Sequence, residues 1–154
     1  KLAECKPNVK TYWDGGDELK NLMRSGEVVA SMAWDTGGWQ LNDDNKDITF
    51  VAPTSGALGW IDTFALPARG RADEAAYAWI NFVMQPEIAA MITKSAGNFT
   101  ASQGGDADVD EALKAKYNAS FPQEAIDNIK WYPSVPAGLE ALEGAALDRI
   151  NAAK

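Results

Sequence analysis

The chain has 154 residues, of which 46% are hydrophobic and 23% charged, so it is long and apolar enough to fold and is not of disordered composition. Its net charge of −8 argues against a nucleic-acid partner, because nucleic-acid binding needs a basic surface. It has no histidine and a single cysteine, Cys5, which excludes the usual zinc, copper and haem sites and predicts neither metal nor cofactor.

The first third of the chain alternates extended and helical patterns. Residues 28–34 are an apolar run typical of a strand inside a parallel sheet, and shorter strands are predicted at 9–13 and 48–52. Between these strands, helical patterns cover 17–25 and 36–41. This β-α-β-α-β order predicts an α/β fold, in which ligands bind at the carboxyl ends of the strands.

The remaining two thirds begin with an extended run at 57–66 and continue mainly as helices. A long amphipathic helix begins near Asp73, and its apolar stripe predicts that Trp79 lies in the core. A second helix follows it and ends at Gly97, a residue type that commonly closes helices. Further helices are predicted over 109–117, 122–129 and 134–152.

Two apolar runs each end with a tryptophan beside an acid: Trp34 with Asp35, and Trp60 with Asp62. A tryptophan face attracts an organic cation and a carboxylate neutralises it, so each pair is a candidate cation site. No lysine or arginine lies within 28–45, or within 51–68, which favours a cationic ligand over an anionic one. The alternative is that these tryptophans belong to the core and that the acids only cap or turn the chain.

The residues alone also leave an enzyme and a sugar-binding protein open. The absence of histidine excludes a Ser-His-Asp or Cys-His arrangement. Asp35 and Asp62, each near a tryptophan that could stack on a sugar, could still form the carboxylate pair of a glycosidase. The same residue types could line a sugar-binding site without any catalysis.

Several blocks of the chain resemble one family in their order and spacing. They are Lys6-Pro7-Asn8-Val9, Ser25-Gly26-Glu27-Val28, Trp34, Trp60-Ile61-Asp62, Ala78-Trp79-Ile80-Asn81-Phe82 and Gln85-Pro86-Glu87. The chain resembles the spermidine/putrescine-binding proteins, which are the periplasmic substrate-binding subunits of polyamine ATP-binding-cassette (ABC) importers. The resemblance implies two α/β lobes joined by a hinge that close on the ligand.

The resemblance also implies a role for individual residues. Trp34 and Trp60 match tryptophans that form aromatic walls around the polyamine, and Asp62 matches an aspartate that pairs with an ammonium group. It implies a binding protein rather than an enzyme, a membrane permease as partner and a periplasmic location. Residues 1–4 are not expected to be part of a signal peptide, because no long apolar stretch follows them.

Three positions depart from the family pattern and leave the ligand open. Asn98 stands where the family has an aromatic residue that contacts the ligand, and Tyr132 aligns near a glutamine of the spermidine binders. Asp35, directly after Trp34, is not the spermidine pattern, and we include it with Asn98 among the candidate ligand contacts. A polyamine is the first expectation, and an amino-acid derivative such as an opine-like compound, or a sugar, is the alternative.

The resemblance covers the C-terminal half of such a two-lobed protein. It implies that residues 1–60 belong to the second lobe, that 61–131 belong to the first lobe after the hinge, and that the final helix, 134–152, returns to the second lobe. The apolar faces of this half would lack partners, and large apolar patches drive association. We therefore expect the chain either to be a fragment that lacks its N-terminal half or to dimerise.

Overall fold

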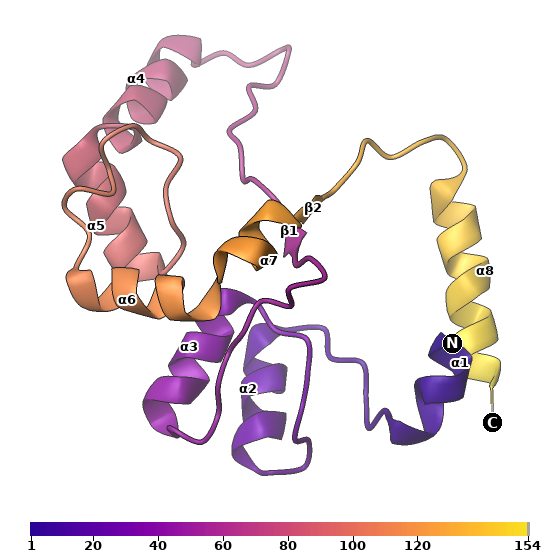
Figure 1. Cartoon of the computed structure of the whole chain (residues 1–154). Helices are drawn as coiled ribbons and strands as arrows, with labels where there is room; N and C mark the ends of the chain where they lie inside the picture. Colours follow the sequence, from indigo (N-terminus) through magenta and orange to yellow (C-terminus); the bar gives the residue numbers. More distant parts are fainter. Residues whose placement is uncertain (154) are drawn as a thin grey trace. The chain divides into compact units, whose positions relative to one another are not determined.

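The structure is a computed structural model that describes residues 1–153 (Figure 1). The backbone contacts divide these residues into two compact units. Unit 1 comprises Lys1–Ile48 and the residues from Tyr132 onward, whereas unit 2 comprises Thr49–Trp131. Each unit has its own buried residues, so each is described separately.

Unit 1 is built from helices near both ends of the chain. They are α1 (Leu2–Cys5), the short 3-10 helix η1 (Lys6–Asn8), α2 (Gly16–Arg24), α3 (Asp35–Asp44) and α8 (Leu139–Ala152). The first and last helices contact each other, and the Lys6 ammonium donates hydrogen bonds to the backbone carbonyls of Asn151 and Ala153. These bonds join the N-terminal segment to the end of α8.

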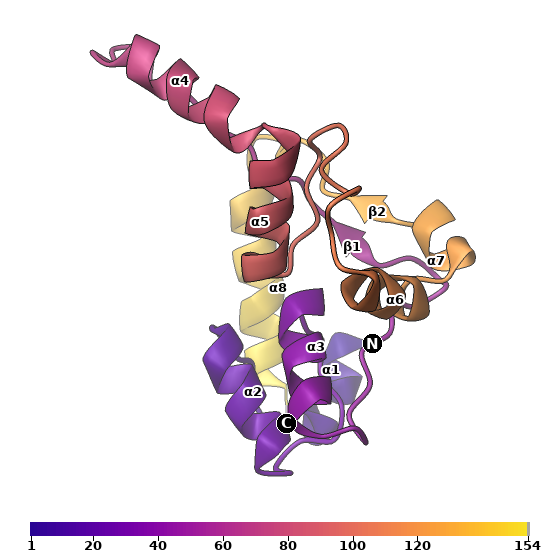
Figure 2. The ribbon, with the colours of Figure 1, turned by 90° about the vertical axis from the view of Figure 1, so that its left-hand side faces the viewer.

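Helices α2 and α3 lie side by side, as Figure 2 shows, and enclose the buried residues of unit 1. Leu19 on α2 and Leu41 on α3 are almost completely buried, and Trp39, two residues before Leu41, is buried as well. The helix predicted over 17–25 is confirmed, and the one predicted over 36–41 is confirmed but extends further, to Asp44.

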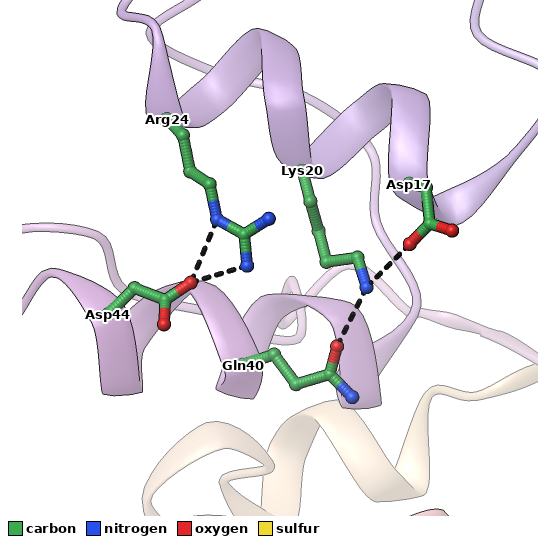
Figure 3. A network of polar contacts seen from close by, with 5 residues as sticks. All are labelled: Asp17, Lys20, Arg24, Gln40 and Asp44. Atoms are coloured by element: carbon green, nitrogen blue, oxygen red, sulfur yellow. Dashed lines mark hydrogen bonds and ion pairs between the residues drawn. The ribbon is translucent and has the colours of Figure 1, made fainter.

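A polar network joins the exposed edges of α2 and α3 (Figure 3). The Arg24 guanidinium donates through Nε to Oδ2 of Asp44 at 2.9 Å. The Lys20 ammonium donates to Oε1 of Gln40 at 3.0 Å and pairs with Oδ1 of Asp17 at 2.8 Å. Exposed ion pairs of this kind contribute only about 0.2–1 kcal/mol each, so the network adds little to the stability of the contact between the two helices.

Unit 2 contains four helices and one short parallel strand pair among its described residues. They are β1 (Leu58–Gly59), α4 (Asp73–Val83), α5 (Pro86–Ala96), α6 (Glu111–Ser120), α7 (Gln123–Asp127) and β2 (Lys130–Trp131). In the strand pair, Leu58 lies opposite Lys130 and Gly59 lies opposite Trp131. Gly97, with φ of +81°, closes α5 as predicted.

The core of unit 2 combines small apolar side chains with a run of aromatic rings. Ala89 and Ala90 on α5 and Ala125 on α7 are almost completely buried, whereas few larger side chains of this unit are. The Tyr117 ring of α6 stacks on Phe121 at 4.8 Å between ring centroids and packs against Phe99 at 4.7 Å. The aromatic run therefore attaches the loop after α5 to α6.

The predicted strands at 9–13, 28–34 and 48–52 are wrong in this structure, and the run at 57–66 contributes only β1. These segments are extended, but a strand also requires a neighbouring backbone to hydrogen-bond with, and β1–β2 is the only such pair in the described part of the chain. Val29, in the middle of the most apolar run, is 92% exposed. The result is a helix-dominated chain with a small parallel sheet, consistent with a partial α/β fold.

The prediction that Trp79 lies in the core is also wrong. Its side chain is 57% exposed, and of the apolar stripe on α4 only Val83 is buried. The main element that α4 contacts is α5, the next helix along the chain. An apolar stripe is buried only where another element covers it, and periodicity cannot show whether one does.

Candidate ligand-binding residues

Trp34 stands at the start of α3, where its backbone is extended and caps the helix. Trp34 is 44% exposed as a residue, so it is accessible to a ligand. The Trp13 ring meets it edge-on, with ring centroids 5.1 Å apart and an interplanar angle of 75°. The indole N–H of Trp13 donates to the Ser31 hydroxyl oxygen at 3.1 Å. Two segments that are distant in the sequence thus form one aromatic corner.

The start of α2 also restrains the aromatic corner formed by Trp13 and Trp34. The backbone N–H of Asp14 donates to Oε2 of Glu18 at 3.1 Å, which fixes the turn directly after Trp13. Gly16, the first residue of α2, lies against the Trp34 ring: a Cβ added there would be 3.6 Å from Cζ3. Trp34 therefore contacts both Trp13 and the first turn of α2.

Asp35 is half-buried at the first position of α3, next to the exposed ring. Burial raises the pKa of its carboxyl group above the ordinary value, while the backbone N–H groups of Thr36 and of Asp35 itself act in the opposite direction. The N–H of Thr36 donates to Oδ1 at 2.8 Å. The positive end of the helix dipole also favours the charged form. The site thus holds a partly desolvated carboxylate that a nearby cation would stabilise.

The second tryptophan–acid pair lies in unit 2, directly after β1. Trp60 is 43% exposed and Asp62 is exposed, and both lie in an extended segment without regular structure. The backbone is closely packed at the neighbouring Gly59, where an added Cβ would be 2.6 Å from Cγ2 of Ile129 and 3.1 Å from ring atoms of Trp131. The strand pair therefore positions the backbone that leads into Trp60 but leaves its side chain open.

Asn98 follows the residue that closes α5, and its side chain is exposed. Its neighbour Phe99 packs against Tyr117, which holds the backbone of this loop. Tyr132, the first residue after β2, is exposed as well. The structure thus presents these two of the three departures from the family pattern, Asn98 and Tyr132, at accessible positions.

The structure brings the predicted site residues together unequally. Trp34 and Asp35 share one local site in unit 1 with Trp13 and Ser31. Trp60 and Asp62 lie in unit 2, in an extended segment without regular structure. Sequence reasoning singled out neither Trp13 nor Ser31 as a site residue. The one available signal was the hydroxyl of Ser31 inside the otherwise apolar run 28–34.

Residues 1–153 also bear on two other classes of feature, membrane-spanning helices and metal sites. None of these helices combines the length and the apolar character needed to cross a bilayer. In the same residues, no group of three or more histidine, cysteine, aspartate or glutamate side chains is placed to hold a metal ion. Cys5 is exposed and is not in a disulfide.

Comparison with known proteins places the chain in a family. The model of the bacterial extracellular solute-binding proteins matches residues 1–120, so the chain belongs to this family. The family resemblance predicted from the sequence is thereby confirmed. The family consists of solute-binding proteins rather than enzymes, which sets the glycosidase alternative aside.

Among individual proteins, the chain is 27% identical over 143 residues to the spermidine/putrescine-binding periplasmic protein of Escherichia coli, covering 92% of this chain and 40% of that protein. It is 28% identical over 133 residues to spermidine/putrescine-binding periplasmic protein 1 of Haemophilus influenzae, covering 86% and 33%. It is 26% identical over 98 residues to the putrescine-binding periplasmic protein of E. coli, covering 60% and 26%. The chain thus spans less than half the length of these relatives. No solved structure matches it significantly.

Proposed function

We propose that this chain is part of the substrate-binding component of a periplasmic ABC importer and that it takes part in binding a polyamine or a related organic cation. Relatives that match most of the chain are named for binding spermidine and putrescine in the periplasm, which supports the ligand class and the location. The membrane permease of the importer would be its protein partner.

The observation that carries this proposal is the pairing of Trp34 and Asp35 at the start of α3. A polyamine has a methylene stem, which packs on an aromatic ring, and ammonium groups, which pair with carboxylates. The exposed Trp34 ring and the half-buried Asp35 offer both surfaces at consecutive positions. Burial strengthens the attraction because the carboxylate is partly removed from water.

We assign further contacts in unit 2 on the same chemical grounds. Trp60 would supply a second aromatic wall, and Asp62 would pair with an ammonium group. The exposed amide of Asn98 would donate to or accept from a polar ligand group. In this proposal residues 1–60 and 134–152 belong to the second lobe of the binding protein, and residues 61–131 belong to the first.

A second candidate ligand is an amino-acid derivative such as an opine-like compound, or a sugar. The observation that favours it is the exposed polar side chain of Asn98, where the resemblance implies an aromatic ligand contact. Such a ligand would still use the tryptophan surfaces but would need amide groups in place of some of the carboxylates.

We also propose that a further polypeptide surface covers the apolar side chains of unit 1. Val29 and Met32 are largely exposed in the run that leads to Trp34. Either a second copy of the chain or the N-terminal half of a longer protein would bury them. In both cases the apolar side chains are uncovered in the isolated 154-residue chain, and exposed apolar patches of this kind drive association. The isolated chain should therefore associate with itself in solution.

The test is isothermal titration of the chain with putrescine, spermidine and a neutral sugar, after sedimentation velocity has established its association state. Trp34→Ala should weaken putrescine binding about 2- to 30-fold, the range for a cation–π contact. Trp60→Ala and Asp62→Asn should weaken it as well. Trp79→Ala is the matched control, because Trp79 is a comparably exposed tryptophan outside the proposed site.

The outcomes separate the parts of the proposal. Binding of putrescine that is lost in Trp34→Ala and retained in Trp79→Ala supports the cation site. Sugar binding without polyamine binding would replace the cation by the second candidate. A monomer at all concentrations would overturn the proposed association but not the ligand class.

A further inference from the structure

We propose that Trp13 is a positioning residue that sets the orientation of the Trp34 ring through its hydrogen bond to Ser31. The inference rests on the proposed function, because it assigns Trp13 and Ser31 a part in forming the aromatic wall of that site. It concerns unit 1 alone, where all three residues lie.

The first argument is the geometry of the two rings. At 5.1 Å between centroids and 75° between planes, Trp13 and Trp34 form the edge-to-face pair that aromatic quadrupoles favour. An exposed indole has rotational freedom about its two side-chain torsions. The contact with Trp13 removes part of this freedom while leaving 44% of the Trp34 side chain accessible.

The second argument is that Trp13 is itself held in place. Its indole N–H, which can only donate, bonds to the Ser31 oxygen at 3.1 Å. The hydroxyl of Ser31 in turn donates to the backbone carbonyl of Met32 at 2.9 Å, so its own hydrogen points away from Trp13 and a lone pair is free to accept. Ser31 lies three residues before Trp34, and the bond therefore ties Trp13 to the segment that carries the ring.

The third argument is the fixed turn after Trp13. The bond from the Asp14 N–H to Glu18 anchors this turn to the first turn of α2. Trp13 is therefore restrained on both sides, by α2 through its backbone and by Ser31 through its side chain. A ring held by such a neighbour is pre-organised, and the ligand does not have to immobilise it.

The first readout needs no ligand. The chain is labelled with 5-fluorotryptophan, its six tryptophans are observed by ¹⁹F NMR, and the Trp34 signal is assigned by its loss in Trp34→Phe. Ser31→Ala removes only the acceptor, and Trp13→Phe retains a ring but removes the donor. Both should shift or broaden the Trp34 signal, whereas Trp79→Phe should not. An unchanged Trp34 signal in both variants overturns the proposal.

The second readout is putrescine affinity measured on unlabelled protein. Ser31→Ala and Trp13→Phe should each weaken binding about 2- to 10-fold, the cost of ordering one side chain on binding. In a Trp34→Ala background the effect of Trp13→Phe should disappear, since there is no ring left to position. An additive effect in that background would mean that Trp13 acts independently of Trp34 and would overturn the proposal. Absence of putrescine binding in the parent would refute the proposed function, and the ¹⁹F spectra would then still decide whether Trp13 orients Trp34.

Discussion

The two tryptophan–acid pairs of this chain look alike in the sequence but differ in how the structure holds them. Trp34 and Asp35 begin a helix, and their neighbours Trp13, Ser31 and Gly16 restrain them. Trp60 and Asp62 lie in an extended segment whose nearest regular structure is a strand of two residues. The two pairs contain the same residue types and equally exposed tryptophans, but the neighbouring residues restrain the first pair more than the second.

The difference follows from the elements that carry the two pairs. A helix forms its backbone hydrogen bonds between residues close in the sequence, and the Trp34 carbonyl accepts such a bond from the Gly38 N–H at 3.0 Å. The backbone at the start of α3 is therefore held by a local contact. A strand depends on a neighbouring backbone, and β1 has one only through its short pairing with β2. The second pair therefore depends on a contact between residues about seventy positions apart, such as Leu58 and Lys130.

The largest expected effect is at the glycine beside the second pair. In Gly59→Ala the new Cβ would be 2.6 Å from Cγ2 of Ile129 and 3.1 Å from ring atoms of Trp131. Crowding of this kind costs about 1–3 kcal/mol, and it should separate β1 from β2. Urea unfolding followed by circular dichroism measures the loss.

Gly16→Ala is the matched control for this prediction, beside the first pair. Its new Cβ would make only an ordinary contact, 3.6 Å from the Trp34 ring. Alanine is also the better helix former, so the change in stability should stay within about 0.5 kcal/mol or be favourable. Equal losses in the two variants would contradict the difference drawn between the two pairs.

A smaller effect is expected where α2 and α3 are joined by charge. Asp44→Asn removes the ion pair with Arg24 and should lower the free energy of unfolding by about 0.2–1 kcal/mol. The loss should shrink at high salt, because both groups are partly exposed. Asp47→Asn is the control: this acid is exposed, and no ion pair is recorded for it among the described residues. A loss that does not depend on salt would assign the effect to something other than charge.

The smallest effect should appear as a pH dependence at Asp35. Burial raises the pKa of its carboxyl group above 3.8, so the folded state favours the protonated acid. The resulting stabilisation is complete below the pKa of the unfolded chain and is lost as the pH rises through the raised pKa of the folded state. Asp35→Asn cannot undergo this loss, and its stability relative to the parent should therefore rise across that interval.

Urea unfolding between about pH 3 and about pH 7 measures this change. If Asp35→Asn follows the parent curve, the burial of this carboxyl group does not act on stability in the way described. Putrescine should in addition bind less tightly to the parent as Asp35 becomes protonated.

Sequence reasoning succeeded for features that are local. The bounds of α2, the start of α4 at Asp73 and the end of α5 at Gly97 follow from side-chain periodicity and from residues that end helices. It was wrong for the run 28–34, whose apolar character predicts a strand but supplies no partner for one. The prediction that Trp79 is buried was wrong for the same reason, because in the described chain no element covers the Trp79 part of the apolar stripe on α4.

The sequence by itself determined the family, the order of the helices and the two tryptophan–acid pairs. These depend on residue identity and on spacings within about one or two helical turns, which can be read along the chain. Only the tertiary structure decided that Trp13 and Ser31 support Trp34, that Asp35 is half-buried and that β1 pairs with β2. Each of these depends on residues that are brought together from separate segments, and local spacing does not encode such contacts.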